Sequence, residues 1–188
     1  ELPYDESIAT VAKVMTKRCR EQYEIVREEY AGLDYYKTQL LRNFIYKGPI
    51  LEWYFKVKFA MENRYRLFNQ WIPRDAKIID LGCGYGFLDL MLAMISPKRE
   101  IIGVDFDEEK IKLAQHSAIR SESLNFVHAD VTLFPLQNAD VFLILDTLHY
   151  LPAEKQMALI KECILHLNPG GKILIRDANT DLKDKHKS

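Results

Sequence analysis

The spacing of apolar residues changes once along this chain, close to Pro73. Upstream, apolar side chains recur every three or four residues, as at Ile8, Val11 and Met15, which is the spacing of one helix face. From Ala76 onward, short apolar runs of strand length alternate with segments of helical spacing. The pattern predicts an N-terminal helical cap over residues 1–71 and an α/β domain over residues 72–188.

Residues that cap or break helices and strands set the expected boundaries. In the first part they predict helices at residues 8–30, 34–46 and 49–71. In the second part we expect strands at residues 77–81, 100–104, 124–128, 141–145 and 172–175. Helices are expected at residues 87–95, 108–119 (capped by Asp107) and 153–167, with a turn at 168–171. This alternation of apolar strands with helices is typical of a Rossmann-like α/β fold, a doubly wound, mostly parallel sheet covered on both faces.

A glycine-rich turn follows the first predicted strand. The run Asp80-Leu81-Gly82-Cys83-Gly84-Tyr85-Gly86 leads directly into a helix, and Asp105 closes the next strand. A strand, a glycine turn, a helix and a strand ending in an acid describe a nucleotide-binding βαβ unit. Nicotinamide-dependent oxidoreductases use G-x-G-x-x-G, whose third glycine would fall at Phe87, so that function is disfavoured.

The glycines at positions 82, 84 and 86, with an acid two residues before the first, resemble motif I of class I S-adenosylmethionine (SAM)-dependent methyltransferases. The resemblance covers residues 76–178. It implies that Asp80, Gly82 and Gly84 face the methionine part of SAM and that Asp105 accepts hydrogen bonds from both ribose hydroxyls. It also implies that Phe106 packs on the adenine and that Asp130 binds the adenine amino group. Cys83, as a spacer in the turn, and Val131 complete the expected cofactor-binding residues.

Each of these residues also has a purely structural interpretation. A glycine turn after a strand can serve the fold alone, and an acid at a strand end often caps a helix. Asp130-Val131-Thr132 can form a simple turn.

The segment from Asp146 to Pro152 follows the fourth predicted strand and resembles the corresponding segment of small-molecule methyltransferases. His149 is the candidate general base, with Asp146 and Tyr150 as its partners, if the acceptor is a hydroxyl or an acidic carbon. The alternative is that His149 is a packing or capping group of the loop. Arg176 and Asp177, after the fifth strand, either clamp an acidic substrate or pair with each other.

The composition of the chain argues against several classes of function. The chain is 48% hydrophobic and 28% charged, with a net charge of −1, and its core carries no basic stripe, so a nucleic-acid partner is not expected. No apolar run approaches the roughly 20 residues of a membrane span. Three widely spaced cysteines, Cys19, Cys83 and Cys163, predict reduced thiols in a cytoplasmic protein. The histidines lack metal-site spacing, so we expect no metal.

The helical segment 34–71 carries seven basic and three acidic side chains, interleaved with aromatic residues. Such a surface suits the cytoplasmic face of an anionic membrane or a lipid-like substrate, although a helical cap with solvated charges would look the same. The string from Tyr46 to Tyr54, together with the glycine motif, resembles the methyltransferase module attached to lysophospholipid acyltransferase-like domains in bacterial multidomain proteins. That resemblance implies covalently attached neighbouring domains and a lipid-like acceptor.

The sheet of the methyltransferase family normally has seven strands and ends in an antiparallel hairpin, whereas five strands are expected here. This difference favours a chain truncated at its C-terminus, and the start without methionine favours a piece of a longer protein. The sequence predicts a SAM-dependent methyltransferase that acts on a small-molecule or lipid-like acceptor. The alternative is a degenerate SAM-fold module that serves as a binding or regulatory domain.

Overall fold

The computed structural model describes residues 33–44, 49–61, 65–117 and 121–177. The predicted helix at residues 8–30 and Cys19 therefore lie outside the described residues. By its contacts the chain divides into two compact units, Glu1–Tyr36 and Lys37–Ser188. The sheet and the site described below belong entirely to the second unit.

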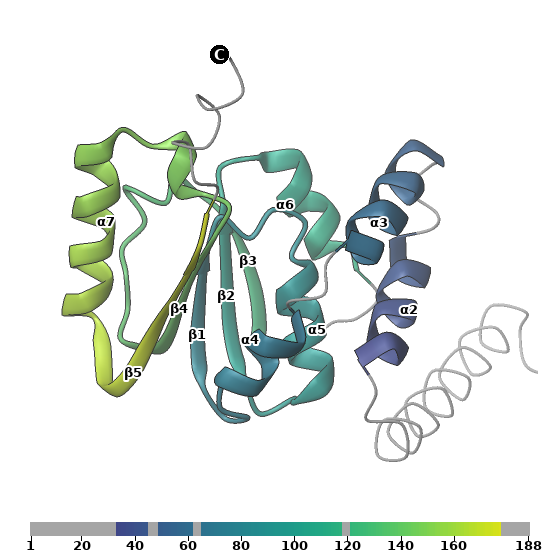
Figure 1. Cartoon of the computed structure of the whole chain (residues 1–188), viewed down its shortest axis with the longest axis horizontal. Coiled ribbons are helices and arrows are strands. Elements are labelled where there is room, and N and C mark those ends of the chain that lie inside the picture. Colours follow the sequence, from purple (N-terminus) through teal and green to yellow (C-terminus); the bar gives the residue numbers. More distant parts are fainter. Residues whose placement is uncertain (1–32, 45–48, 62–64, 118–120, 178–188) are drawn as a thin grey trace, which may run out of the picture. The chain divides into compact units, whose positions relative to one another are not determined.

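Five parallel strands form the sheet (Figure 1). They are β1 (Lys77–Leu81), β2 (Glu100–Asp105), β3 (Leu124–His128), β4 (Ala139–Leu145) and β5 (Leu167–Arg176). Their order across the sheet is β3-β2-β1-β4-β5, so the chain reverses its direction of progress between β1 and β4. In a doubly wound sheet this reversal opens a crevice at the carboxyl ends of the strands, where ligands bind.

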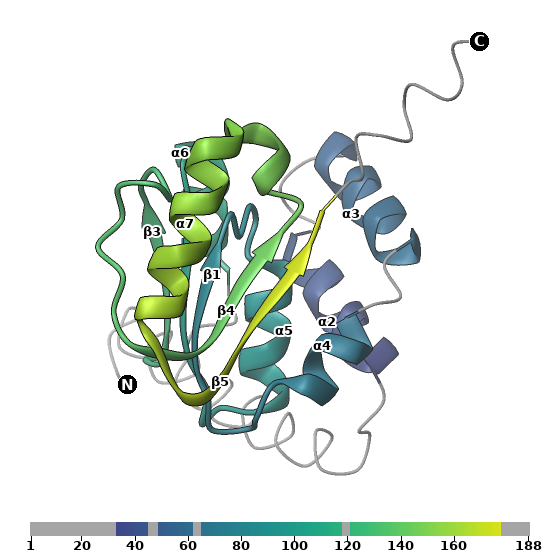
Figure 2. The same ribbon diagram turned by 60° about the vertical axis from the view of Figure 1, so that its left-hand side comes forward.

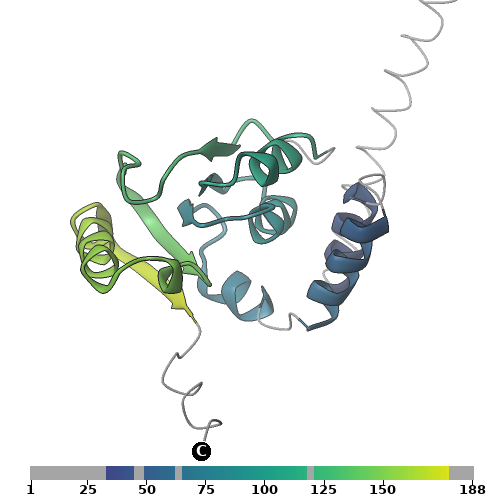
Figure 3. The same ribbon diagram turned by 90° about the horizontal axis from the view of Figure 1, so that it is seen from above.

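Helices lie on both faces of this sheet. The helix α7 (Ala153–Leu165) lies on one face, and α4 (Tyr65–Trp71), α5 (Phe87–Ile95) and α6 (Glu108–Gln115) lie on the other, as Figures 1, 2 and 3 agree. The remaining described helices are α2 (Leu33–Phe44) and α3 (Pro49–Met61). None of the helices within the described ranges is long and apolar enough to cross a membrane.

The predicted elements and the observed ones agree closely in the sheet. The ranges of β1, β3 and α5 match their predictions, and the Asp107 carboxylate caps α6 by accepting a hydrogen bond from the Lys110 N–H at 3.1 Å. The predicted turn at residues 168–171 instead lies within β5. There the pairing with β4 skips from Leu167 to Lys172, and Gly170 adopts a φ of +80°.

A buried arginine ties the start of β1 to the helices behind the sheet. Arg99 is fully buried, and its guanidinium donates hydrogen bonds to the carbonyl oxygens of Pro73 (2.9 Å), Ile72 (2.8 Å) and Leu92 (3.1 Å). It also bonds the side-chain oxygen of Asn69 at 3.0 Å. Ile72 and Pro73 directly follow α4, and Leu92 lies in the last turn of α5, where its carbonyl also accepts from the Ser96 N–H. Arg99 therefore fixes where α4 joins the sheet.

Candidate functional site

A cavity of about 750 Å³ opens at the carboxyl ends of the strands. The eleven site residues expected from the sequence all line it: Asp80, Gly82, Cys83, Gly84, Asp105, Phe106, Asp130, Val131, Asp146, His149 and Tyr150. The helices α3 and α4 add Tyr54, Lys58 and Tyr65 to the wall. The crevice predicted from the strand order is therefore present, and it gathers residues that are up to 122 positions apart in the sequence, from Tyr54 to Arg176.

The glycine turn is shaped so that the backbone itself forms part of the cavity wall. Gly82 has a φ of +94°, and a Cβ at this position would lie 1.9 Å from the Thr147 Oγ1. Gly84 has a φ of +58°, and a Cβ there would meet no atom within 4 Å. Because Gly84 lines the cavity, a side chain at this position would project into open space that a ligand can use.

Asp105 braces the glycine turn against the end of β2. Its side chain is buried, and its Oδ2 accepts a hydrogen bond from the Gly84 N–H at 2.7 Å. Its Oδ1 accepts one from the Asp107 N–H at 2.9 Å. Each carboxylate oxygen can accept a second hydrogen bond, so the carboxylate can still bind a vicinal diol.

The Asp130 side chain stabilises a turn over residues 130–132, which is the structural interpretation that the sequence also allowed. Its Oδ1 accepts hydrogen bonds from both the N–H and the hydroxyl of Thr132, each at 2.8 Å. These bonds hold the pKa of the Asp130 carboxyl below its usual value. Asp130 nevertheless lines the cavity beside the buried Val131, whereas Phe106 is 68% exposed at the rim. The turn and an adenine contact are therefore geometrically compatible.

Asp80 places a buried carboxylate against the floor of the cavity. The residue is 3% exposed, and no donor within the described part of the chain reaches its Oδ1. Burial, more than any neighbouring charge, raises the pKa of Asp80 to about 7. An unpartnered buried carboxylate oxygen next to a cavity favours a ligand that brings a hydrogen-bond donor or a positive charge.

These features fit SAM, which carries a ribose diol, an ammonium group and a positive sulfur. Asp105 suits the diol, Asp80 suits a cationic group, and the open side of Gly84 leaves room for the ligand. Cys83 acts as a small spacer, because burial and the carboxylates of Asp89, Asp80 and Asp105 raise the pKa of its thiol and keep it protonated. No group of metal-ligating side chains occurs among the residues that the structure describes.

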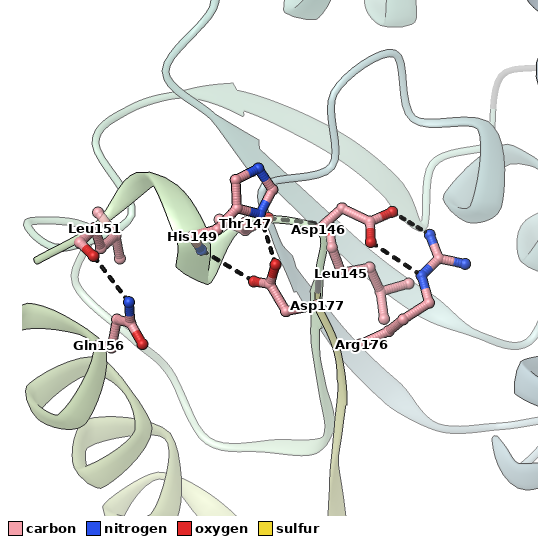
Figure 4. Close-up of polar contacts among 8 residues, drawn as sticks. All are labelled: Leu145, Asp146, Thr147, His149, Leu151, Gln156, Arg176 and Asp177. Carbon is pink, nitrogen blue, oxygen red and sulfur yellow. Dashed lines mark hydrogen bonds and ion pairs between the residues drawn. The ribbon is translucent and has the colours of Figure 1, made fainter. Parts of the chain in front are cut away.

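At the other end of the cavity, His149 pairs with Asp177, as Figure 4 shows. The His149 Nδ1 lies 2.5 Å from the Asp177 Oδ1, and the His149 backbone N–H donates to the Asp177 Oδ2 at 3.1 Å. A carboxylate can only accept, so Nδ1 carries a proton, and in the neutral form of this ring Nε2 offers a lone pair. The Tyr150 ring lies beside the imidazole, with 4.0 Å between their centroids.

The expected pairing of Asp146 with His149 is wrong. Asp146 has a φ of 55°, and its carboxylate faces the Arg176 guanidinium, which bonds both of its oxygens (Figure 4). Of the two neighbours after Ile175, Arg176 thus bonds Asp146 and Asp177 bonds His149. Consecutive residues of an extended strand point to opposite sides, so each reaches a different residue of the loop after β4.

Sequence reasoning missed Asp89 and the aromatic wall. Asp89 is a buried acid on α5, and neither its spacing nor its neighbours distinguish it from an ordinary helix residue. Tyr54, Phe55, Tyr85 and Phe87 pack ring against ring above the glycine turn. Asp177 was among the candidates because of its place after the last strand, but its pairing with His149 was not expected.

The fold and the site together define the cofactor-binding domain of a class I SAM-dependent methyltransferase, and the cofactor of this class is SAM. The model of a family described as "Methyltransferase domain" matches residues 78–171, half of the chain. The chain belongs to this methyltransferase domain family.

Known relatives agree with this assignment. A ubiquinone biosynthesis O-methyltransferase of Idiomarina loihiensis is 34% identical over 111 residues, which cover 57% of this chain and 44% of the relative. The PH0226 protein of Pyrococcus horikoshii has a similar fold, with a TM-score of 0.55 at 23% identity over 62% of this chain and 56% of that one. The plantazolicin methyltransferase BpumL, solved with S-adenosyl-L-homocysteine, also gives 0.55 at 19% identity, over 81% and 63%. The chain spans about half or less of the length of the curated relatives it matches.

Proposed function

We propose that this chain transfers the methyl group of SAM to a small-molecule or lipid-like acceptor, with His149 as the general base. The observation that carries the proposal is the shared cavity, in which the acids suited to SAM and the His149 imidazole line one space. The bound cofactor would supply an electrophilic methyl group. The chain would then have to align the acceptor with that methyl group and exclude water.

The pairing of His149 with Asp177 supports a role in proton transfer. Asp177 holds both the backbone N–H and the Nδ1–H of His149, so the ring can rotate little and Nε2 is the nitrogen left for an acceptor. A hydroxyl acceptor would give its proton to Nε2 as its oxygen forms the bond to the methyl carbon. The name of the Idiomarina relative, an O-methyltransferase, supports an oxygen acceptor.

The surface of α3 supports a lipid-like acceptor. Ile50 is 84% exposed and Trp53 is 67% exposed, whereas Tyr54 and Lys58 of the same helix line the cavity. An apolar surface next to the cavity entrance, with Lys56 and Lys58 close by in the helix, suits an amphiphile or the surface of an anionic membrane. We include peripheral contact with the cytoplasmic face of a membrane in the proposal, and attached neighbouring domains on the resemblance of residues 46–54.

The test has two parts, binding and transfer. S-adenosylhomocysteine is titrated calorimetrically into the chain, and methyl transfer from labelled SAM is then followed with panels of phenols, carboxylic acids and amphiphilic hydroxyl compounds. We expect micromolar binding and transfer to at least one hydroxyl panel, with transfer abolished by His149→Gln while binding persists.

Three outcomes would count against the proposal in different ways. Binding without transfer to any panel would favour the degenerate module that acts through binding alone. Transfer that survives His149→Gln would remove the base from the mechanism. If wild type and Trp53→Ser transferred methyl groups equally well to amphiphiles, as well as to short soluble acceptors, this would argue against the role of the α3 surface.

A further inference from the structure

A second buried acid lies directly behind the cofactor-facing carboxylate. Asp80 on β1 pairs in register with Gly103 on β2. Because Gly103 has no side chain, Asp89 of α5 occupies the space above it: a Cβ at position 103 would lie 2.7 Å from the Asp89 Oδ2. Asp89 is fully buried and, unlike Asp80, does not line the cavity.

The two carboxyl groups can satisfy each other only by sharing a proton. No donor in the described part of the chain reaches the Asp80 Oδ1 or either oxygen of Asp89. Two ionised carboxylates in this position would repel each other and leave three buried oxygens without a hydrogen bond, which is costly. One proton on Asp89 turns it into a donor that bonds Asp80.

The charged groups around the pair agree with this arrangement. Burial raises the pKa of Asp89 well above its ordinary value, and the charge of Asp80 raises it further. For Asp80, burial and the charge of Asp105 on β2 raise the pKa, whereas Lys58 on α3 and Arg176 on β5 lower it. The neighbouring Cys83 thiol stays neutral. At neutral pH, Asp89 thus keeps its proton while Asp80 lies near the midpoint of its titration.

We propose that Asp89 is a positioning residue of the cofactor site, and that the proton it shares with Asp80 makes the protein distinguish SAM from S-adenosylhomocysteine by charge. The inference deepens the proposed function and rests on SAM being the cofactor. SAM has a positive sulfur, which S-adenosylhomocysteine lacks after the methyl group has left. An ionised Asp80 attracts the first more strongly than the second, and a protonated Asp80 loses that preference.

The sign of the pH dependence follows from the raised pKa. Asp80 is charged above pH 7 and becomes neutral below it, so the affinity for SAM should fall as the pH falls. For a pKa of about 7 in the free protein, linkage gives a roughly tenfold loss of SAM affinity from pH 8 to pH 6. The affinity for S-adenosylhomocysteine, whose net charge is zero, should fall by less than about threefold.

The closing experiment is calorimetric titration of SAM and of S-adenosylhomocysteine at pH 8 and pH 6. Wild type is compared with Asp89→Asn and with Glu100→Gln, an exposed acid at the opposite end of β2. The Asn amide donates a permanent hydrogen bond to Asp80 and carries no charge, so the SAM affinity of Asp89→Asn should become nearly independent of pH. Glu100→Gln should behave as wild type. Wild type should also release protons when it binds SAM at pH 7, measured in two buffers of different ionisation enthalpy.

A cofactor-free measurement separates this inference from the proposed function. Between about pH 4 and pH 7 the pair of Asp80 and Asp89 binds more protons in the folded protein than in the unfolded chain, so its contribution to stability against urea should fall as the pH rises through this window. Asp89→Asn should lose less stability than wild type over the same window. Equal pH dependence for SAM and S-adenosylhomocysteine, or the same pH dependence in Asp89→Asn, would overturn the inference alone. Failure of both ligands to bind at pH 8 would overturn the proposed function, and the charge discrimination with it.

Discussion

The two ends of the cavity are built in different ways. At the cofactor end, Asp105 is 6% exposed and bonds two backbone N–H groups, and the glycine backbone forms the wall. At the end proposed for the acceptor, which we call the acceptor end, side-chain pairs predominate: His149 bonds Asp177, which also accepts from the His149 backbone N–H, and Asp146, whose side chain is 51% exposed, bonds Arg176. A site held by backbone groups tolerates few substitutions, whereas one held by side-chain pairs can change its partners with little effect on the fold.

The position of the strands in the sheet does not account for this difference, because β1, β2 and β4 each have a hydrogen-bonded neighbour on both sides. What differs is the kind of group that each side chain bonds. Arg176 at the end of β5 bonds Asp146, and Asp177 after it bonds His149, both in the loop after β4. We therefore expect substitutions to be tolerated better at this end than at the glycine turn.

At the cofactor end, the largest loss of stability is expected when one methyl group is added to Gly82. In Gly82→Ala the Cβ would lie 1.9 Å from the Thr147 Oγ1 while the backbone stays at a φ of +94°. We expect a loss of roughly 3 kcal/mol in the free energy of unfolding, from overpacking and backbone strain together. Urea denaturation followed by circular dichroism measures it.

The matched control is Gly170→Ala, which has a φ of +80° but no atom within 4 Å of the added Cβ. Backbone strain alone should lower its free energy of unfolding by about 1 kcal/mol. Equal losses in the two variants would show that contact with Thr147 does not constrain the turn.

The acceptor end should lose catalysis without losing stability. In a transfer assay with an identified acceptor, His149→Gln should lower kcat by roughly 10²- to 10⁴-fold, the usual range for general acid–base catalysis. Asp177→Asn should lower kcat by less, since the ring remains but its orientation is no longer held. Neither variant should change the Kd of S-adenosylhomocysteine by more than about twofold, because neither side chain belongs to the cofactor end.

A pH–rate profile separates a positioning role of Asp177 from a structural one. If Asp177 orients the base, Asp177→Asn should shift the profile of kcat as well as its height. A drop in kcat with an unchanged profile and a matching loss of stability would show a structural role instead.

Two acids of the cofactor end allow a finer comparison. Asp105→Asn places an amide N–H₂ against one of the two backbone N–H groups that the carboxylate now binds. We expect the Kd of S-adenosylhomocysteine to rise roughly 10- to 100-fold, the equivalent of losing a hydrogen bond to a charged group. Asp130→Asn keeps the acceptor of its exposed turn and should raise the Kd by less than about fivefold. Calorimetric titration of both variants measures the difference, and the reverse order would place the main recognition of the ligand at the end of β3.

The smallest effect is expected at the ion pair of Asp146 and Arg176. Asp146 is half exposed, so Asp146→Asn should change the free energy of unfolding by less than about 1 kcal/mol. Its effect on KM for different acceptors would show whether Arg176 takes part in substrate recognition. A loss of several kcal/mol would contradict the distinction drawn between the two ends.

The same distinction explains what the sequence could predict. The strands and the glycine turn were predictable because local sequence determines them, as the matching ranges of β1, β3 and α5 show. The partner of His149 was not, because Asp177 is 28 positions away and reaches it only through the pairing of β5 with β4. Asp89 was missed because its environment is created by the absence of a side chain at Gly103 on another strand.

The buried guanidinium of Arg99 has a consequence far from its own position. It directly precedes the amino end of β2, at the opposite end of the strands from the cavity. Its bonds to Asn69 and Ile72 nevertheless hold α4 in place. That helix carries Tyr65 into the cavity wall and places the Phe68 ring 5.8 Å from the Arg176 guanidinium carbon. A substitution at position 99 would therefore reach the wall of the cavity through α4, without any direct contact between the altered side chain and a ligand.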